Sequence, residues 1–82
     1  MNKETRERID IHLKERLALA ILVLVNDAIE LGEKINAEEV KKLANDWGVT
    51  CRINGNLSTN DARLDRINLD VEGDLAKKVI IG

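Results

Sequence analysis

The chain has 82 residues, of which 44% are hydrophobic, and a formal net charge of -2 from 13 basic and 15 acidic residues. This length fits one small domain, and a charge so close to neutral argues against a strongly basic nucleic-acid binder. Phenylalanine and tyrosine are absent and Trp47 is the single aromatic residue, so we expect a core of Leu, Ile, Val and Ala. The lack of Phe, Tyr and Pro also leaves open a designed or engineered origin.

The N-terminal residues, the longest apolar run and the single cysteine bear on the cellular location of the protein. The first ten residues, MNKETRERID, are charged and mixed in sign, unlike a signal peptide. The longest apolar run, Leu17 to Val25, is too short to span a membrane. One cysteine, Cys51, cannot form an internal disulfide, which fits a reducing compartment or a secreted protein without bridges. We expect a cytoplasmic protein with no membrane partner.

The segment from Thr5 to Leu31 is predicted to be one long helix, because helix-forming residues dominate it. Asn2 or Thr5 is a candidate N-cap, and Gly32 is a plausible C-terminal stop. Apolar residues recur at spacings of three and four on two neighbouring stripes. One stripe contains Ile9, Leu13, Leu17, Ala20, Leu24, Ala28 and Leu31, and the other contains Ile11, Ala18, Leu22, Val25 and Ile29.

Between Leu17 and Val25 this helix is apolar on all sides. A helix of that kind must be covered on most of its surface, and a domain this small has little to cover it with. We therefore expect contact with a second copy or another protein. The candidate interface residues are Leu13, Leu17, Ile21, Leu24 and Ala28. A buried strand at Leu19–Val25 is the competing interpretation, because Ile21, Val23 and Val25 are β-branched.

A second, amphipathic helix is predicted over Ala37 to Trp47. Asn36 is its N-cap, with Glu39 three residues on in the arrangement of a capping box, and Gly48 ends it. Its apolar positions, which we expect to face a sheet, are Val40, Leu43, Ala44 and Trp47.

Three strands are predicted after this helix, at Val49–Ile53, Leu64–Val71 and Leu75–Ile81, with a turn at Glu72–Asp74. After one offset at Asp65–Arg66 the second strand alternates, which predicts one buried face and one wet face. Its wet positions are Asp65, Arg66, Asn68 and Asp70. The elements together indicate an α+β fold with two helices and a three-stranded sheet.

Residues suited to catalysis or metal binding are scarce. His12 has no Cys, His or acidic cluster at ligand spacing, which makes a metal site improbable and a solvated histidine the simpler interpretation. Cys51 occupies an inward strand position and is expected to act as a small apolar residue. The sequence therefore indicates a protein that is not an enzyme and has no cofactor.

Three stretches resemble the potato inhibitor I family of serine protease inhibitors. Asn36–Leu43, NAEEVKKL, resembles the family helix, and Leu69–Gly82 resembles its last two strands. Gly55–Ile67, GNLSTNDARLDRI, resembles the reactive loop: a glycine, an apolar residue, a threonine, the scissile pair, and arginines leading into a strand. The resemblance covers residues 36–82, so residues 1–31 form an N-terminal helical extension of the single domain 1–82.

The resemblance implies that a serine protease is the partner and that the cleaved bond would be Asn60–Asp61, with Thr59 before it. The binding loop would consist of Leu57, Ser58, Thr59, Asn60, Asp61 and Ala62. Arg66, with Arg63, would hold this exposed loop through charge-assisted hydrogen bonds. The resemblance also implies that the two strands flanking the loop run parallel, which makes the sheet mixed.

The sequence departs from the family at several loop and support positions. Asn60 stands where large apolar side chains are usual, Ala62 replaces a bulky residue, and Asn68 replaces a second supporting arginine. Two alternatives to inhibition therefore stay open. One is that residues 55–62 form a plain surface loop that only connects two strands. The other is that the protein is a non-enzymatic scaffold whose N-terminal helix drives homo-oligomer formation.

Overall fold

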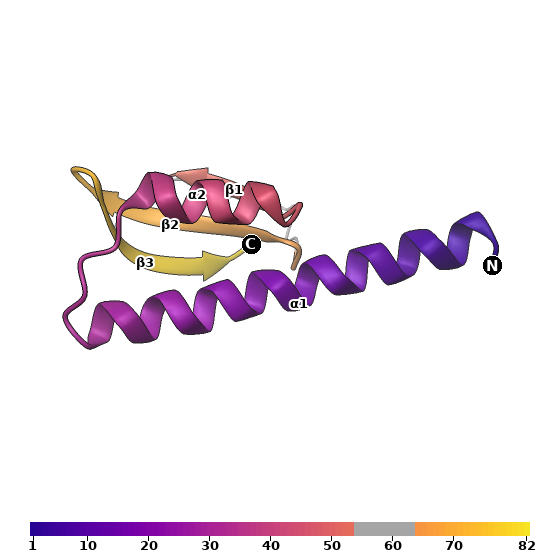
Figure 1. The fold of residues 1–82 in the computed structure, drawn as a ribbon, viewed down its shortest axis with the longest axis horizontal. Helices are drawn as coiled ribbons and strands as arrows, with labels where there is room; N and C mark the ends of the chain where they lie inside the picture. Colours follow the sequence, from indigo (N-terminus) through magenta and orange to yellow (C-terminus); the bar gives the residue numbers. More distant parts are fainter. Residues whose placement is uncertain (54–63) are drawn as a thin grey trace.

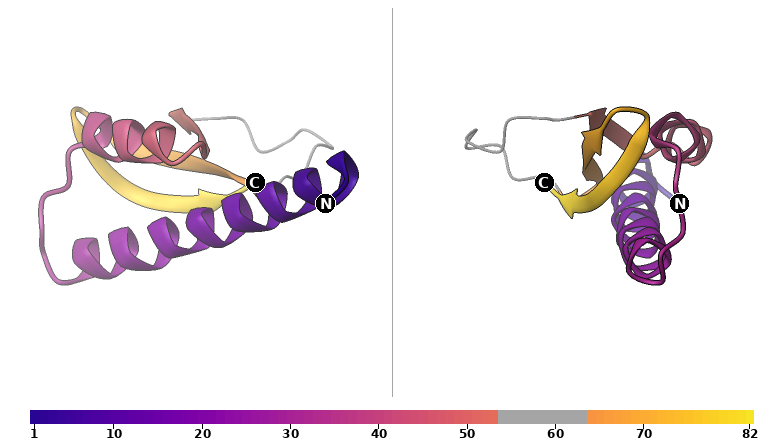
Figure 2. Two further views of the ribbon diagram at one scale, coloured as in Figure 1. Left: turned by 45° about the vertical axis from the view of Figure 1, so that its right-hand side comes forward. Right: turned by 90° about the vertical axis from the view of Figure 1, so that its left-hand side faces the viewer.

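The computed structural model describes residues 1–53 and 64–82. In this part of the chain the helices are α1 (Lys3–Glu30) and α2 (Ala37–Asp46), and the strands are β1 (Thr50–Ile53), β2 (Arg66–Glu72) and β3 (Leu75–Ile81). The expected α+β fold, with a long N-terminal helix and a mixed sheet, is confirmed. Both helices lie on one face of the sheet, and the first half of α1 extends past it (Figures 1 and 2).

Each helix is delimited by the residues that the sequence indicated. The Asn2 side chain accepts a hydrogen bond from Thr5 N at 2.8 Å at the start of α1. Asn36 does the same for α2, with Glu38 N at 2.9 Å and Glu39 N at 3.2 Å. These bonds satisfy main-chain donors that have no partner inside the helix.

The C-terminus of α2 determines how the chain enters the sheet. Gly48 N donates to Asn45 O and Val49 N donates to Ala44 O, the paired bonds of a Schellman motif. This motif needs a left-handed residue after the cap, and Gly48 has a φ of 77°. Val49 is thereby turned inward and is 1% exposed, directly before β1 begins.

The sheet has the order β1-β2-β3 in the described residues. β1 pairs with β2 in parallel, from Thr50 opposite Arg66 to Ile53 opposite Leu69. This confirms the orientation that the family resemblance implied. β2 and β3 are antiparallel and are joined through the predicted turn, where Gly73 has a φ of 62°. A positive φ of this kind is common in tight hairpin connections.

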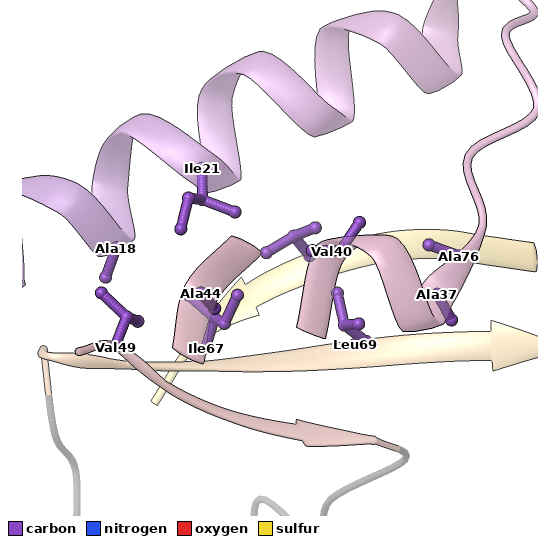
Figure 3. Close-up of a cluster of buried hydrophobic side chains, with 10 residues drawn as sticks. Ala18, Ile21, Ala37, Val40, Ala44, Val49, Ile67, Leu69 and Ala76 are labelled. Atoms are coloured by element: carbon purple, nitrogen blue, oxygen red, sulfur yellow. The ribbon is translucent and has the colours of Figure 1, made fainter. Parts of the chain in front are cut away.

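The core is aliphatic, as composition predicted, and every described element contributes to it, β1 only through the half-buried Cys51. Figure 3 shows Ala18 and Ile21 pointing from α1 toward the side chains of α2 and the sheet. The second half of α1 is therefore part of the same core as residues 36–82. The buried apolar residues are Ala18, Ile21, Ala37, Val40, Ala44, Val49, Ile67, Leu69, Ala76 and Val79.

Asn26 ties α1 to the outer edge of β3. Its side-chain amide donates to Val79 O at 3.0 Å, and its side-chain oxygen accepts from Val79 N at 2.8 Å. β3 is an edge strand of the described sheet, so these main-chain groups face away from β2 and need another partner. One side chain therefore satisfies both of them. This residue was not singled out from the sequence.

The apolar face predicted for the second helix is wrong at two of its four positions. Val40 and Ala44 are buried against the sheet, but Leu43 is 44% exposed and Trp47 is 59% exposed. Ala37, one turn before Val40, is also buried. The buried face is thus built from Ala37, Val40 and Ala44, and Trp47 is the C-cap residue, where α2 has already ended.

Candidate functional site

The candidate binding segment is bounded by the parallel strands β1 and β2. β1 ends at Ile53 and β2 begins at Arg66, and Ile53 lies opposite Leu69 in the register. Parallel neighbours require a connection that returns along the sheet. The predicted loop residues Leu57 to Ala62, and the predicted support residue Arg63, lie outside the described residues.

Arg66 is the first residue of β2 and is 7% exposed. Its Nε donates a hydrogen bond to the main-chain oxygen of Gly82 at 2.8 Å, and its own main-chain oxygen accepts from Gly82 N at 3.0 Å. The guanidinium is therefore held at the end of the sheet where the chain enters β2. A side chain so fixed loses little further freedom when it supports a neighbouring group.

Asn68 lies two residues along the same face of β2 and is 3% exposed. Its Nδ2 donates to the same Gly82 oxygen at 2.6 Å. Its Oδ1 is buried without a hydrogen-bond partner in the described part of the chain. The position where the family resemblance implied a second arginine thus holds a short side chain that bonds to the end of β3.

The predicted wet face of the second strand is therefore wrong at Arg66 and Asn68. Asp70 on this face is exposed, whereas Arg66 and Asn68 are buried although they alternate with the core residues Ile67 and Leu69. Arg66 Nε and Asn68 Nδ2 are tolerated there because the Gly82 oxygen accepts from both. We name Arg66, Asn68 and Gly82 the Arg66 cluster.

A shallow groove of about 480 Å³ lies between α1 and the ends of β2 and β3. It is lined by Glu15, Arg16, Leu19, Leu64 and Ile81. Leu19 and Leu64 are 54% and 61% exposed, so the groove offers apolar surface directly beside the point where the described chain resumes. Among the described residues, no carboxylate pair or nucleophile lines the groove, so it is suited to contact with a partner and not to catalysis.

The predicted interface residues of α1 do not all face the same way. Leu13 and Leu24 are exposed, at 54% and 68%, while Leu17 and Ala28 are half-buried. Ile21 is 7% exposed and packs in the core of its own chain, so its prediction as an interface residue is wrong. The side of α1 that carries Ala18 and Ile21 faces the sheet (Figure 3), and no other described element lies on its opposite side (Figure 1).

The titratable residues singled out from the sequence do not meet one another. His12 lies on the exposed first half of α1, with Nδ1 3.6 Å from a Glu15 carboxylate oxygen. Cys51 is half-buried, and burial raises the pKa of its thiol above the ordinary value. Over residues 1–53 and 64–82 there is no group of acidic, His or Cys side chains arranged to hold a metal. Neither helix in these ranges is long and apolar enough to cross a bilayer.

Comparisons with models of protein families, with curated proteins and with solved structures give no match.

Proposed function

We propose that this chain binds a serine protease through residues 55–62 and inhibits it in the manner of the potato inhibitor I family. The observation that carries the proposal is Arg66, buried and anchored at the start of β2. An inhibitor of this kind needs a cation held beside its loop, and an arginine extended into solvent would not serve. The parallel pairing of β1 and β2 also agrees with the family resemblance.

The physical basis of inhibition is a segment that is already held in its bound conformation. Such a segment loses little entropy on entering a protease cleft, so it binds tightly. Attack by the protease serine on the Asn60 carbonyl would release the amine of Asp61. Support by arginine side chains would keep that amine close, so that the peptide bond re-forms faster than the product leaves.

The test is a titration of the intact chain against subtilisin-like, chymotrypsin-like and asparagine-directed proteases. We expect inhibition in the nanomolar range for at least one of them, as is usual for protease–inhibitor pairs. A folded chain that inhibits none of the panel would remove the proposal.

Arg66→Ala tests the role of the cluster. Loss of a charge-assisted hydrogen bond is worth about 1.5–3 kcal/mol, so we expect inhibition to weaken by about 10- to 100-fold. Arg52→Ala is the matched control, because Arg52 lies on the same face of the neighbouring strand and is exposed. Far-UV circular dichroism checks that each variant is folded.

Arg66→Lys separates charge from geometry. Lysine keeps the charge but cannot reproduce the planar donors of the guanidinium. We expect its inhibition to lie between those of the original chain and Arg66→Ala. If folded Arg66→Ala inhibits as well as Arg52→Ala does, the cluster does not support the binding segment.

A further inference from the structure

The side of α1 that faces away from the sheet carries an apolar strip, with Arg16 and Asp27 beside its two wider spacings. Its members are Ile9, Leu13, Ala20, Leu24 and Leu31, and each of them is exposed. Leu24 and Leu31 are 68% and 86% exposed, which is high for leucines in a domain with so small a core. At 1.5 Å per residue the strip is about 33 Å long, so it is an extended surface suited to another helix.

The charged side chains of α1 fall into two groups. Those on the flanks of the first half pair with one another one turn apart, as in Glu4 with Arg8 and Asp10 with Lys14. Arg6, Arg16, Asp27 and Glu30 have no ion-pair partner within residues 1–53 and 64–82. The unpaired cations thus lie in the first half of α1 and the unpaired anions in its last turns.

This arrangement is unfavourable for the isolated helix. The C-terminal end of a helix carries a partial negative charge, which disfavours Asp27 and Glu30, and the last turn of α1 has no basic residue to offset them. Arg6 likewise lies near the positive end of α1, whereas Arg16 is at its middle. An antiparallel neighbouring helix would offset this arrangement, because the cations in its first half would approach Asp27 and Glu30.

We propose that the apolar strip of α1 binds the same strip of a second copy of the chain, with the two helices antiparallel. The register that we propose places Leu13 opposite Leu31 of the second copy. Ala20 then lies opposite Leu24 of the second copy. Arg16 then meets Asp27 of the second copy, and the twofold symmetry repeats each contact. A parallel pair would instead place arginine against arginine and aspartate against aspartate, which is repulsive.

The proposal does not depend on protease inhibition, because it uses a different face of the molecule from the Arg66 cluster. The contact involves one helix from each copy, so it belongs at the small end of specific interfaces. We therefore expect a dimer whose population depends on protein concentration. Sedimentation velocity of the intact chain over a wide concentration range measures this, and a chain that stays monomeric at every concentration overturns the proposal.

Charge exchange tests the antiparallel direction. Arg16→Glu places two anions together at each end of the contact, and Asp27→Arg places two cations together. We expect each single variant to weaken dimer formation by at least about tenfold, equivalent to 1.4 kcal/mol. Both residues are exposed, so both variants retain the fold. Lys42→Glu and Asp46→Arg make the same changes on the exposed face of α2 and should leave the dimer unchanged.

The single and combined variants together decide between the two directions. With Arg16→Glu and Asp27→Arg in one chain, an antiparallel dimer regains both ion pairs, whereas a parallel dimer still opposes like charges. We expect the combined variant to dimerise as the original chain does. Failure to recover, in a variant that circular dichroism shows to be folded, would overturn the antiparallel arrangement. An unchanged dimer in both single variants would overturn the antiparallel contact between Arg16 and Asp27.

Discussion

Replacement of Asn26 by alanine tests how α1 is attached to the sheet. The change removes two hydrogen bonds and leaves Val79 N and Val79 O without the partner that they have now. Each bond contributes about 1 kcal/mol net, and the unpaired main-chain groups add to the loss, so we expect about 2–3 kcal/mol in all. A domain of this size has about 4–12 kcal/mol of stability, which makes the loss easy to measure.

Equilibrium unfolding in urea, followed by far-UV circular dichroism, is the assay. With a slope of about 1–1.5 kcal/mol per molar urea, the midpoint should fall by roughly 2 M. Asn45→Ala is the control, because Asn45 is exposed on α2 and gains the same helix propensity on substitution. Equal midpoints for Asn26→Ala and Asn45→Ala would refute the reasoning.

Three further predictions concern other parts of the fold. Gly48→Ala should lower stability by about 1–2 kcal/mol in the urea assay, because Gly48 has a positive φ and a Cβ there would lie 3.2 Å from Lys14 Cε; a neutral result would contradict the assigned backbone. Burial raises the pKa of the Cys51 thiol in the folded state, so its contribution to the free energy of unfolding should be fully present below about pH 9 and should be lost as the pH rises through the folded-state pKa. Cys51→Ala should lose this pH dependence. A dependence that persists in the variant would come from another group. Asn68→Asp puts an anion where Nδ2 now donates to Gly82, and should cost about 1–3 kcal/mol at neutral pH with partial recovery in acid, whereas a loss independent of pH would point to packing.

The local features of this fold were well predicted from the sequence because their causes are local. The cap at Asn36 and the stop at Gly48 depend on neighbouring main-chain groups, which a sequence shows directly. The turn around Gly73 is of the same kind. The α+β class followed from these boundaries and from the change in apolar period.

Which side of each element is buried was predicted less well, because that depends on neighbours far along the chain. The apolar positions of α1 form two stripes, and periodicity alone cannot tell which stripe meets the sheet. Ile21 belongs to the core, while Leu24, three residues later, is exposed. The apolar spacing of the second helix predicts Trp47 on the inward face, but Trp47 is the C-cap residue and is 59% exposed.

The contacts of the Arg66 cluster could not be predicted from the sequence. Alternation along the second strand correctly separated two faces, but it could not show that Gly82, 14 residues beyond Asn68, supplies an acceptor for both polar side chains. The parallel direction of β1 and β2 came from the family resemblance, since alternation is the same in either direction.

A single cut between residues 54 and 63 would separate the central strand β2 from its neighbour β1 along the chain. One piece would keep α1, α2 and β1, and the other would keep β2 and β3, yet neither piece contains a whole core. Val40 and Val49 would come from the first piece, and Ile67 and Val79 from the second. The two fragments should stay together as one folded body and separate only in denaturant, after which reassembly would be a bimolecular reaction whose rate rises with fragment concentration.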